Sequence, residues 1–420
     1  LLNYIRTKLK KNGTKEGCAE GGCGACTVVL GEYKDNKINY SSINSCIMFL
    51  PTLHRKQLIL VEDLVSKNGS LHPVQQAMVN YHGSQCGFCT PGFVMSLFSM
   101  FKNYSKFNDD LIKNSISGNL CRCTGYQPII KAAKSLNNKN KADQFTENEK
   151  NIIELLKKIN NESIIIYKKD KKYFAPRYVE ELKKILKKNI NSYLLSGGTD
   201  LSLVVTKERK NIDSIIYMNS IDELNYIKNN NGYIEVGATT PLIKFENYIK
   251  KYYSDFNSIL KRYGSVQIRN TATIAGNIAT ASPIGDTLPL LLSLDAQVVL
   301  KSIKKTKVVP LNKFFIDYRK TKLKMGQFIH SIRIPLFPEN IFKAYKISKR
   351  FDDDISSVCA SFNLQLINKK IKSIKIAYGG MASIPKRAKY CEKILLNSPI
   401  TEQIINKAKE ALEQAFKPIR

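Results

Sequence analysis

Apolar residues recur at helical spacing in two neighbouring stretches of the first third of the chain. The first predicted helix begins with Thr90 as its cap and Pro91 in its first position. Its apolar face comprises Val94, Leu97, Phe98 and Phe101. The second predicted helix begins at Asn108 and ends near Gly118 in a left-handed stop. Its apolar face comprises Leu111, Ile112 and Ile116. Two antiparallel helices would bring the outer ends of these stretches together.

Shorter patterns predict the elements before these helices. Residues 1–16 form an amphipathic segment with apolar residues at helical spacing. Residues 27–30, residues 38–40 and a stretch around Ile47 indicate strands of one small sheet. A further helix is predicted to begin near Pro73.

The later part of the chain changes character. Residues 137–149 turn polar and lose periodicity, which indicates a linker between domains. Residues 193–195 form a short apolar strand. Apolar and polar residues then alternate on both sides of a turn at residues 368–370, which predicts a β-hairpin with one buried face. Thr401 caps a last predicted helix whose inward residues are Ile404, Ala408, Ala411, Leu412 and Ala415.

Four cysteines fall at the outer ends of the two predicted helices, as Cys86-x2-Cys89 and Cys121-x-Cys123. A tetrahedral zinc site prefers a gap of two to four residues within each pair. A single-residue gap suits a [2Fe-2S] cluster better, because its ligands divide between two iron atoms. A structural zinc site and reduced, buried thiols remain as alternatives.

Four more cysteines lie upstream, as Cys18-x4-Cys23-x2-Cys26 with Cys46 further along. This is the plant-type ferredoxin arrangement for a [2Fe-2S] cluster. Glycines among these cysteines let the loop wrap tightly, so that backbone amides face the sulfurs. The two remaining cysteines, Cys359 and Cys391, have no such spacing and are expected to be core thiols.

Two stretches in the second half carry small and hydroxyl-bearing residues. The strand at residues 193–195 is followed by Ser196-Gly197-Gly198-Thr199-Asp200-Leu201, where glycines allow backbone amides to approach a pyrophosphate. A lone Gly-Gly turn is weak support, because a plain strand-to-helix turn has the same pattern. Residues 263–286 offer further amides and hydroxyls around Gly276, and Asp286 can accept hydrogen bonds from ribityl or ribose hydroxyls. No Gly-x-Gly-x-x-Gly follows a strand, so a Rossmann site is not indicated.

Length and charge limit the classes of function. A chain of 420 residues is long enough for roughly three domains. The net charge of +31 suggests nucleic acid or an anionic membrane as a partner. However, the lysines are spread along the chain and are not clustered in one patch. We therefore expect neither nucleic acid nor a membrane as a partner. The grouped cysteines, with no signal peptide and no apolar run of spanning length, predict a cytoplasmic location.

The two cysteine motifs, in this order, closely resemble those of the molybdenum hydroxylases. The first follows Gly13-Thr-Lys-Glu-Gly17, and the second lies within His82-Gly-Ser-Gln-Cys-Gly-Phe-Cys-Thr-Pro-Gly92. Within this family the likeness is greatest to the small iron–sulfur and FAD subunit of bacterial xanthine dehydrogenases, and it covers nearly the whole chain. The family also has a β-hairpin before the segment at residues 1–16 and an arginine-bearing tail after residues 417–419, so the resemblance implies that both ends are shortened here.

The resemblance implies a multidomain α+β fold. A β-grasp plant-type ferredoxin domain and a helical-bundle [2Fe-2S] domain would precede an FAD-binding domain of the vanillyl-alcohol-oxidase type. An α+β C-terminal domain like that of CO dehydrogenase flavoproteins would follow. The expected domains are residues 1–65, 66–137, 171–340 and 341–420, with a linker at 138–170.

The resemblance also assigns site residues by position. The first FAD stretch comprises Leu194, Leu195, Ser196, Gly197, Gly198, Thr199, Asp200 and Leu201. Further FAD contacts fall on Tyr263, Thr273, Ile274, Ala275, Gly276, Asn277, Asp286, Ile329 and Lys346. Gln85 would lie near the partner's molybdopterin, with a hydrogen bond at a helix end as the alternative. The loop Asp352-Asp353-Asp354 would lie near the reactive face of the flavin, with a solvated turn as the alternative.

The function implied by the resemblance is electron transfer. Electrons would enter from a molybdenum centre on a molybdopterin-binding large subunit, in a heterotetramer with two copies of each chain. They would pass through the cluster at Cys86, Cys89, Cys121 and Cys123, then through the cluster at Cys18, Cys23, Cys26 and Cys46, to FAD and finally to NAD. The hydroxylated substrate would be hypoxanthine or xanthine, and this chain would carry no residues for hydroxylation. The alternatives are the same role in a hydroxylase of nicotinate, an aldehyde or another N-heterocycle, or a redox-inactive assembly subunit.

Overall fold

The computed structural model describes residues 1–138 and 142–416, and its contacts divide the chain into two compact units. Unit 1 comprises residues 1–163, 198–213 and 264–271, and unit 2 comprises residues 164–197, 214–263 and 272–420. Residues 139–141 of the expected linker and residues 417–420 of the expected C-terminal domain lie outside the described residues. Among the described residues, none of the helices has the length and apolar character that crossing a membrane requires.

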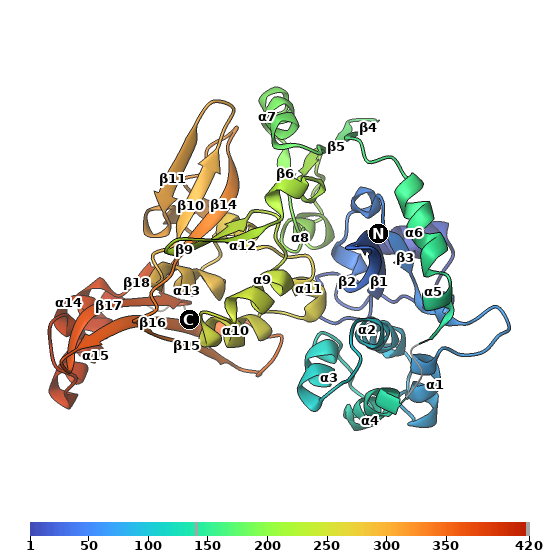
Figure 1. The fold of residues 1–420 in the computed structure, drawn as a ribbon, viewed down its shortest axis with the longest axis horizontal. Helices are drawn as coiled ribbons and strands as arrows, with labels where there is room; N and C mark the ends of the chain where they lie inside the picture. Colours follow the sequence, from blue (N-terminus) through green and yellow to red (C-terminus); the bar gives the residue numbers. More distant parts are fainter. Residues whose placement is uncertain (139–141, 417–420) are drawn as a thin grey trace. The chain divides into compact units, whose positions relative to one another are not determined.

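Unit 1 begins with a small antiparallel sheet of order β2-β1-β3 (Figure 1). Its strands are β1 (Thr27–Lys34), β2 (Lys37–Asn44) and β3 (Gln57–Ile59), and a short π-helical turn, Tyr4–Lys8, precedes them. The strand expected around Ile47 is wrong, because Ser45–Ile47 form a 3₁₀ turn. Ser45 donates hydrogen bonds from its backbone N–H and its hydroxyl to the Cys26 carbonyl, which turns the chain back after β2.

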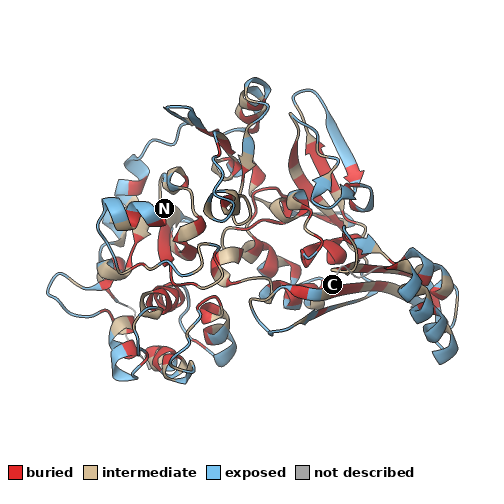
Figure 2. Cartoon of the chain, turned by 180° about the vertical axis from the view of Figure 1, so that it is seen from behind, coloured by how far each residue is buried: buried red, intermediate tan, exposed pale blue. Residues whose placement is uncertain are grey.

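Four helices of unit 1 pack together below this sheet in Figure 1. They are α1 (Pro73–Asn80), α2 (Thr90–Asn103), α3 (Asp109–Ile116) and α4 (Gln127–Ser135). Gly92 to Phe101 of α2 are all buried, so this helix forms the centre of the core (Figure 2). The predicted Asn108 cap is confirmed, since its side chain accepts a 2.9 Å hydrogen bond from the Leu111 N–H.

The left-handed stop predicted at Gly118 is wrong. α3 ends at Ile116, the Ser117 that follows it lies in the right-handed region, and Gly118 has no positive φ. Its requirement for glycine is one of space instead. A Cβ atom at Gly118 would lie 2.2 Å from Ser265 Cβ and 2.6 Å from Gln267 Oε1.

The expected linker contains two helices, α5 (Gln144–Glu147) and α6 (Glu149–Lys158), which belong to unit 1 and pack against its core. Phe145 and Leu156 are buried in the core around α2. Asp143 caps α5 and also lies 2.7 Å from Lys102 Nζ and 3.1 Å from His72 Nε2, with all three side chains nearly inaccessible. The polar stretch predicted to be a linker therefore contains buried apolar and charged residues that hold it against the core of unit 1.

Two later segments of the chain return to unit 1. Residues 198–213 contain α8 (Leu201–Thr206), and residues 264–271 contain α11 (Val266–Arg269). The Ser202 hydroxyl donates a 2.6 Å hydrogen bond to the Ile47 carbonyl. Asn270 Nδ2 donates a 2.8 Å hydrogen bond to the Ser42 carbonyl. Segments expected to bind FAD thus pack on the domain that carries the cysteines.

Unit 2 contains three larger sheets, and two of them are formed by strands between β4 and β14. The first has the order β4-β5-β7-β6, in which β5 and β6 both run parallel to β7, and its strands are β4 (Ile164–Lys168), β5 (Lys171–Ala175), β6 (Tyr193–Leu195) and β7 (Ser214–Tyr217). The second has the antiparallel order β11-β10-β14-β9-β8, and its strands are β8 (Ile227–Asn230), β9 (Tyr233–Gly237), β10 (Gln297–Lys301), β11 (Thr306–Pro310) and β14 (Phe328–Pro335). A short pair, β12 (Phe315–Asp317) and β13 (Lys320–Thr321), accompanies them. The helices of this part are α7 (Val179–Lys188), α9 (Leu242–Ile249), α10 (Ser254–Lys261), α12 (Ile274–Thr280) and α13 (Thr287–Ser293).

The last part of unit 2 is a sheet of order β15-β16-β17-β18 with two helices. Its elements are β15 (Ile341–Ser348), β16 (Ser356–Ile367), β17 (Lys370–Gly379), β18 (Lys386–Arg387), α14 (Lys389–Leu395) and α15 (Glu402–Ala415). The predicted hairpin is confirmed as β16 and β17, joined by Asn368 and Lys369, which both have positive φ angles as a two-residue hairpin turn requires. The predicted Thr401 cap is confirmed by a 3.4 Å hydrogen bond from the Ile404 N–H.

His330 on β14 gives unit 2 a pH-dependent stability. Burial lowers the pKa of His330 from 6.5 to about 4. The unfolded chain therefore binds a proton on this residue below about pH 6.5, whereas the folded chain does so only near pH 4. The stabilising contribution is present above pH 6.5 and is lost as the pH falls toward 4. Because the side chain is partly exposed, solvent screening limits the loss to about 1–2 kcal/mol. Thermal unfolding at pH 7 and pH 5 should show a smaller decrease in Tm for His330→Gln than for the unchanged chain, and equal decreases would contradict this assignment.

Candidate functional site

The first cysteine group lies in the loop before β1 and at the end of β2. Cys26 Sγ and Cys46 Sγ are 3.2 Å apart. Cys18 Sγ accepts hydrogen bonds of 3.4 Å from the backbone N–H groups of Glu20 and Cys23. Backbone donors directed at a sulfur stabilise negative charge on it. The wrapping loop predicted from the sequence is confirmed.

Glycines make the close wrapping of this loop possible. A Cβ atom at Gly17 would lie 2.8 Å from Cys23 Sγ. Gly24 has a φ of +69°, and a Cβ atom there would lie 2.1 Å from the Gly118 carbonyl oxygen. In contrast, a Cβ atom at Gly22 would meet no atom within 4 Å. The loop therefore tolerates no side chain on the side facing α2 and α3, but it has open space at Gly22.

The four thiols of the first group perturb each other's ionisation. Contact with Cys23 and Cys46 lowers the pKa of Cys18, and contact with Cys18 raises the pKa of both Cys23 and Cys46. Contact with Cys46 also lowers the pKa of the buried Cys26. These sulfurs lie so close together that they cannot all be thiolates in water at neutral pH. Such an arrangement is typical of a site where bound metal neutralises the negative charge of the thiolates.

The second cysteine group lies where α2 begins and where the chain approaches α4. Its side chains form two pairs, since Cys86 contacts Cys123 and Cys89 contacts Cys121. Burial raises the pKa of Cys89 to about 12. Burial also opposes ionisation of Cys121, but hydrogen bonds from the Thr124 hydroxyl and N–H outweigh it and lower that pKa. The neighbouring cysteines in Cys121-x-Cys123 thus belong to different pairs.

This pairing fits a two-iron cluster. A [2Fe-2S] cluster takes two thiolates on each iron, so four cysteines are expected as two pairs rather than around one point. Among residues 1–138 and 142–416, no group of three or more His, Cys, Asp or Glu side chains is arranged to hold a single metal ion. The donor set of each group, four cysteine sulfurs with backbone or hydroxyl donors, fits an iron–sulfur cluster.

The second group is the more exposed of the two. Cys86 and Cys123 are exposed, and so are Gln85 and Arg122 beside them. Phe88, also in this loop, exposes 47% of its surface. Gln85 is exposed directly before Cys86 on this face, as a contact to a partner requires. Its assigned contact with molybdopterin stays a prediction.

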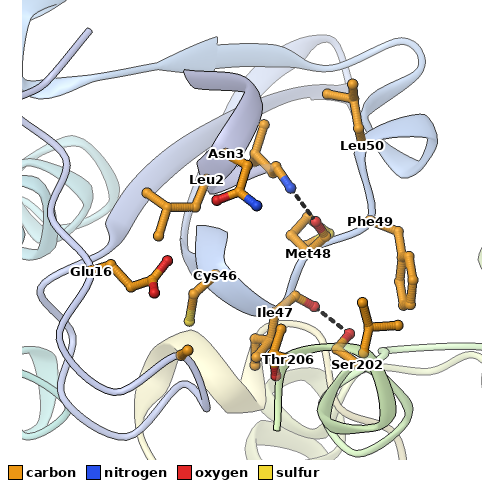
Figure 3. A pocket seen from close by; sticks show the side chains of 13 residues that line it. Leu2, Asn3, Glu16, Cys46, Ile47, Met48, Phe49, Leu50, Ser202 and Thr206 are labelled. Carbon is orange, nitrogen blue, oxygen red and sulfur yellow. Dashed lines mark hydrogen bonds between the residues drawn. The ribbon is translucent and has the colours of Figure 1, made fainter. Parts of the chain in front are cut away.

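A pocket of about 390 Å³ opens beside the first cysteine group within unit 1 (Figure 3). Its lining includes Leu2, Glu16, Cys46, Met48 and Thr206. The Leu1 amino group donates a 2.7 Å hydrogen bond to the Met48 carbonyl at its edge. Cys46 is therefore the cysteine of the first group that lines this pocket.

The candidate FAD residues of unit 2 form a polar cluster around the start of α12. Thr273 caps this helix by accepting a 3.0 Å hydrogen bond from the Gly276 N–H. The Ser196 hydroxyl lies 3.5 Å from Thr273 Oγ1 and donates a 2.6 Å hydrogen bond to Asn219. Asn277 Nδ2 donates to the Tyr263 hydroxyl at 2.9 Å. Parts of both predicted stretches, far apart in the sequence, are thus brought together.

A buried ion pair lies within the same unit. Lys346 Nζ is 2.8 Å from Asp286 Oδ2, and these side chains are 1% and 6% exposed. The Ser356 hydroxyl also donates to Asp286, and Lys346 donates a 3.0 Å hydrogen bond to the Arg262 carbonyl. Asp286 and Lys346, assigned separately from the sequence, are therefore direct partners, which the sequence did not predict.

Other assigned residues lie at different places. Ile329 is buried in β14, paired with Leu300 of β10. Asp352, Asp353 and Asp354 lie in the loop between β15 and β16. A hydrogen bond from the Arg350 N–H lowers the pKa of Asp354. Gly198 has the positive φ, +76°, that a glycine allows in the first stretch.

One buried hydroxyl supports the fit to a cofactor. Thr239 is 1% exposed, and its hydroxyl has no hydrogen-bond partner among the described residues. It lies two residues before Pro241, which forms an isolated β-bridge with Thr273 at the start of α12. A buried hydroxyl without a partner is costly unless a bound group satisfies it. No sequence pattern predicted a role for Thr239, because a threonine after a strand is ordinary.

Breaking the buried ion pair should affect both stability and flavin retention. Lys346→Met leaves the Asp286 carboxylate buried without its counter-ion, which is expected to cost about 3–5 kcal/mol and to lower the FAD content. Lys343→Met on the same strand is the control, since Lys343 Nζ lies 3.5 Å from Asp255 and is half exposed. Chemical denaturation and flavin absorbance of both variants measure the difference. Equal effects of the two substitutions would contradict a special role for the buried pair.

Three family matches cover most of the chain. Residues 60–134 match a [2Fe-2S] binding domain, and residues 167–337 match the FAD binding domain in molybdopterin dehydrogenase. Residues 343–420 match the CO dehydrogenase flavoprotein C-terminal domain. The chain therefore contains a [2Fe-2S] binding domain, an FAD-binding domain and a C-terminal flavoprotein domain.

Curated relatives match nearly the whole chain. Xanthine dehydrogenase of Emericella nidulans is 32% identical over 99% of this chain and 35% of its own length. Xanthine dehydrogenase/oxidase of Gallus gallus is 30% identical over 91% of this chain and 34% of its own length. The chain thus spans about a third of the length of these relatives.

Solved structures share the fold over more than half of the chain. Carbon monoxide dehydrogenase from Hydrogenophaga pseudoflava, lacking the Mo-pyranopterin moiety of its cofactor, gives a TM-score of 0.57 at 23% identity, covering 61% of this chain and 90% of that chain. Quinoline 2-oxidoreductase from Pseudomonas putida 86 gives a TM-score of 0.55 at 20% identity, covering 59% and 87%.

Proposed function

Because the chain belongs to the molybdenum hydroxylase family, as its iron–sulfur and flavin-binding part, we propose that it carries electrons from a molybdenum centre on a partner chain to NAD. The observation that carries this proposal is the pair of four-cysteine groups in unit 1, in a chain that also contains an FAD-binding domain. When bound, the clusters would supply single-electron transfer, and FAD would supply the change from one-electron to two-electron chemistry that NAD requires.

The cysteines have distinct roles in this proposal. Cys86, Cys89, Cys121 and Cys123 would hold the cluster nearer the partner, because two of these side chains are exposed. The other cluster would be held by Cys18, Cys23, Cys26 and Cys46, in a loop where Gly17 and Gly24 leave no space for a side chain. Gln85 and Phe88 border the exposed pair, and we propose this face as the contact with a molybdopterin-binding partner.

We propose that the residues assigned to FAD bind it through a polar cluster that the chain already forms. Thr273 fixes the start of α12, and Gly276 has open space beside it, since a Cβ atom there would meet only Thr273 Oγ1 within 4 Å, at 3.1 Å. We propose that the Asp286 carboxylate, whose Oδ2 lies 2.8 Å from Lys346 Nζ, also accepts hydrogen bonds from hydroxyl groups of FAD. Thr239 adds a donor that the protein itself leaves unused. Asp352, Asp353 and Asp354 would adjust access of NAD to the flavin.

We propose xanthine or hypoxanthine as the substrate oxidised on the partner. Support comes from the xanthine dehydrogenases, which match 99% of this chain at 32% identity. The assembly would contain two copies of each chain and would work in the cytoplasm. A hydroxylase of another heterocycle or of an aldehyde is the competing function, since the same electron path would serve it.

The chain purified anaerobically with its partner tests this function. We expect two different [2Fe-2S] signals by electron paramagnetic resonance, bound FAD, and bleaching of visible absorbance by xanthine that NAD reverses. Bleaching by NADH but not by xanthine would contradict only the proposed purine substrate and would leave the electron-transfer function in place. Iron and flavin contents near zero would contradict the electron-transfer function and leave an assembly role.

A further inference from the structure

Gln267 is a buried amide that joins elements of both cysteine groups. It lies on α11, in the segment that returns to unit 1, and only 1% of it is exposed. Its Nε2 lies 3.2 Å from Thr27 Oγ1, 3.1 Å from Ser96 Oγ and 3.2 Å from Asn119 Oδ1. These three acceptors come from β1, from α2 and from the segment after α3.

Two of these acceptors belong to the cysteine loops themselves. Thr27 directly follows Cys26, and its hydroxyl donates a 2.7 Å hydrogen bond to the Gly24 carbonyl. Asn119 lies two residues before Cys121, and its Nδ2 donates to the same carbonyl at 3.1 Å. The Gly24 carbonyl in the first loop is therefore held by the residue after Cys26 and by the residue two positions before Cys121.

A backbone hydrogen bond joins the two loops again. The Leu120 N–H donates to the Cys23 carbonyl at 3.0 Å. Leu120 directly precedes Cys121. The two ligand loops are thus in direct contact, and the position of one depends on that of the other.

The direction of each hydrogen bond shows why an amide is required at position 267. The Thr27 hydroxyl donates to Gly24, and the Ser96 hydroxyl donates to Asn119 Oδ1 at 2.6 Å. Each hydroxyl has one hydrogen, so both can only accept from Gln267. The two amide hydrogens of Gln267 are shared among three acceptors. Removing them would leave three buried oxygens with fewer donors at the junction of the loops.

The segment around Gln267 holds this amide in place. Arg269 donates a 2.6 Å hydrogen bond to Asn114 Oδ1 on α3, and Asn270 donates to the Ser42 carbonyl on β2. Gly118 leaves just enough space for Gln267, since a Cβ atom there would lie 2.6 Å from Gln267 Oε1. Gln267 Oε1 itself has no hydrogen-bond partner among the described residues, so the amide is held through its Nε2.

We propose that Gln267 is a positioning residue that sets the reduction potentials of both clusters by holding the two ligand loops in one hydrogen-bonded network. The inference rests on the proposed binding of two [2Fe-2S] clusters. Without this amide, the loops relax and the backbone N–H groups near the sulfurs, such as those donating to Cys18, lose their orientation. Weaker donation to the sulfurs stabilises the reduced, more negative cluster less, so both potentials become more negative.

The test is a potentiometric titration of Gln267→Met in the chain purified with its partner, followed by electron paramagnetic resonance. Methionine matches glutamine in length but offers no donor. We expect unchanged iron content. For both clusters, we expect a several-fold decrease in the equilibrium constant for one-electron reduction. A tenfold decrease corresponds to a reduction potential that is about 59 mV more negative.

Asn137→Leu is the matched control. Asn137 also makes two hydrogen bonds within unit 1, of 2.7 and 2.9 Å with Phe107, but it lies beyond the far end of α4 from Cys123. We expect it to lower the Tm without moving either potential. If Gln267→Met lowers the Tm and leaves both potentials unchanged, its role is only structural and the inference fails. Absence of either cluster signal in the unchanged protein would instead contradict the proposed function.

Discussion

Replacing Cys123 with serine is expected to remove one of the two clusters and about half of the bound iron. Cys123 is an exposed member of the second group, paired with Cys86, and the [2Fe-2S] binding domain match includes both residues. A serine hydroxyl ionises far less readily than a thiol and is a poor ligand for iron in such clusters. One of the two paramagnetic signals should disappear, while the signal of the first group and the bound FAD remain.

Cys391→Ser provides the matched control for this prediction. Cys391 is buried in α14 and donates a 3.1 Å hydrogen bond from its thiol to the Ala408 carbonyl. We expect its replacement to leave both iron content and paramagnetic signals unchanged. Loss of iron in Cys391→Ser, or full iron content in Cys123→Ser, would contradict the assignment of the second group as a cluster site.

The second large effect is expected at Gly24. Gly24→Ala places a Cβ atom 2.1 Å from the Gly118 carbonyl oxygen in a backbone conformation with a φ of +69°. The left-handed conformation alone costs an alanine about 1–2 kcal/mol. The overlap with backbone atoms adds to this, so we expect destabilisation of more than about 3 kcal/mol and loss of the first cluster.

Gly22→Ala in the same loop is the matched control, because it adds the same side chain at a position that is not crowded. Gly22 has no positive φ, and a Cβ atom there would meet nothing within 4 Å. Iron analysis and chemical denaturation should show a nearly unchanged protein for Gly22→Ala and a severe defect for Gly24→Ala. Similar results for both would mean that the close approach of the first loop to α3 does not govern the site.

Local patterns predicted much of the local structure. The Asn108 and Thr401 caps, the hairpin turn at Asn368 and Lys369, and both cysteine groups follow from side chains and spacings that act over a few residues. These features depend on hydrogen bonds or backbone angles within one turn or loop. The sequence around them therefore contains what is needed to predict them.

Long-range contacts account for what the sequence did not predict. Residues 144–158 lie within the expected linker at 138–170. However, Phe145 and Leu156 are buried in a hydrophobic core that residues of α2 form. Gly118 was assigned a left-handed stop, although its glycine is required by Ser265, which lies far along the chain. The same holds for Gln267 and for the unpaired Thr239, whose importance depends on what surrounds them in space.

An anaerobic titration with NADH, followed by visible absorbance and electron paramagnetic resonance, tests the central claim most directly. The protein should be purified with its partner, so that both cysteine groups keep their native surroundings. The account predicts that flavin absorbance decreases and that two reduced [2Fe-2S] signals appear in the same sample. Bleaching of the flavin without either cluster signal would contradict an electron path that joins the cysteine groups to FAD within this chain.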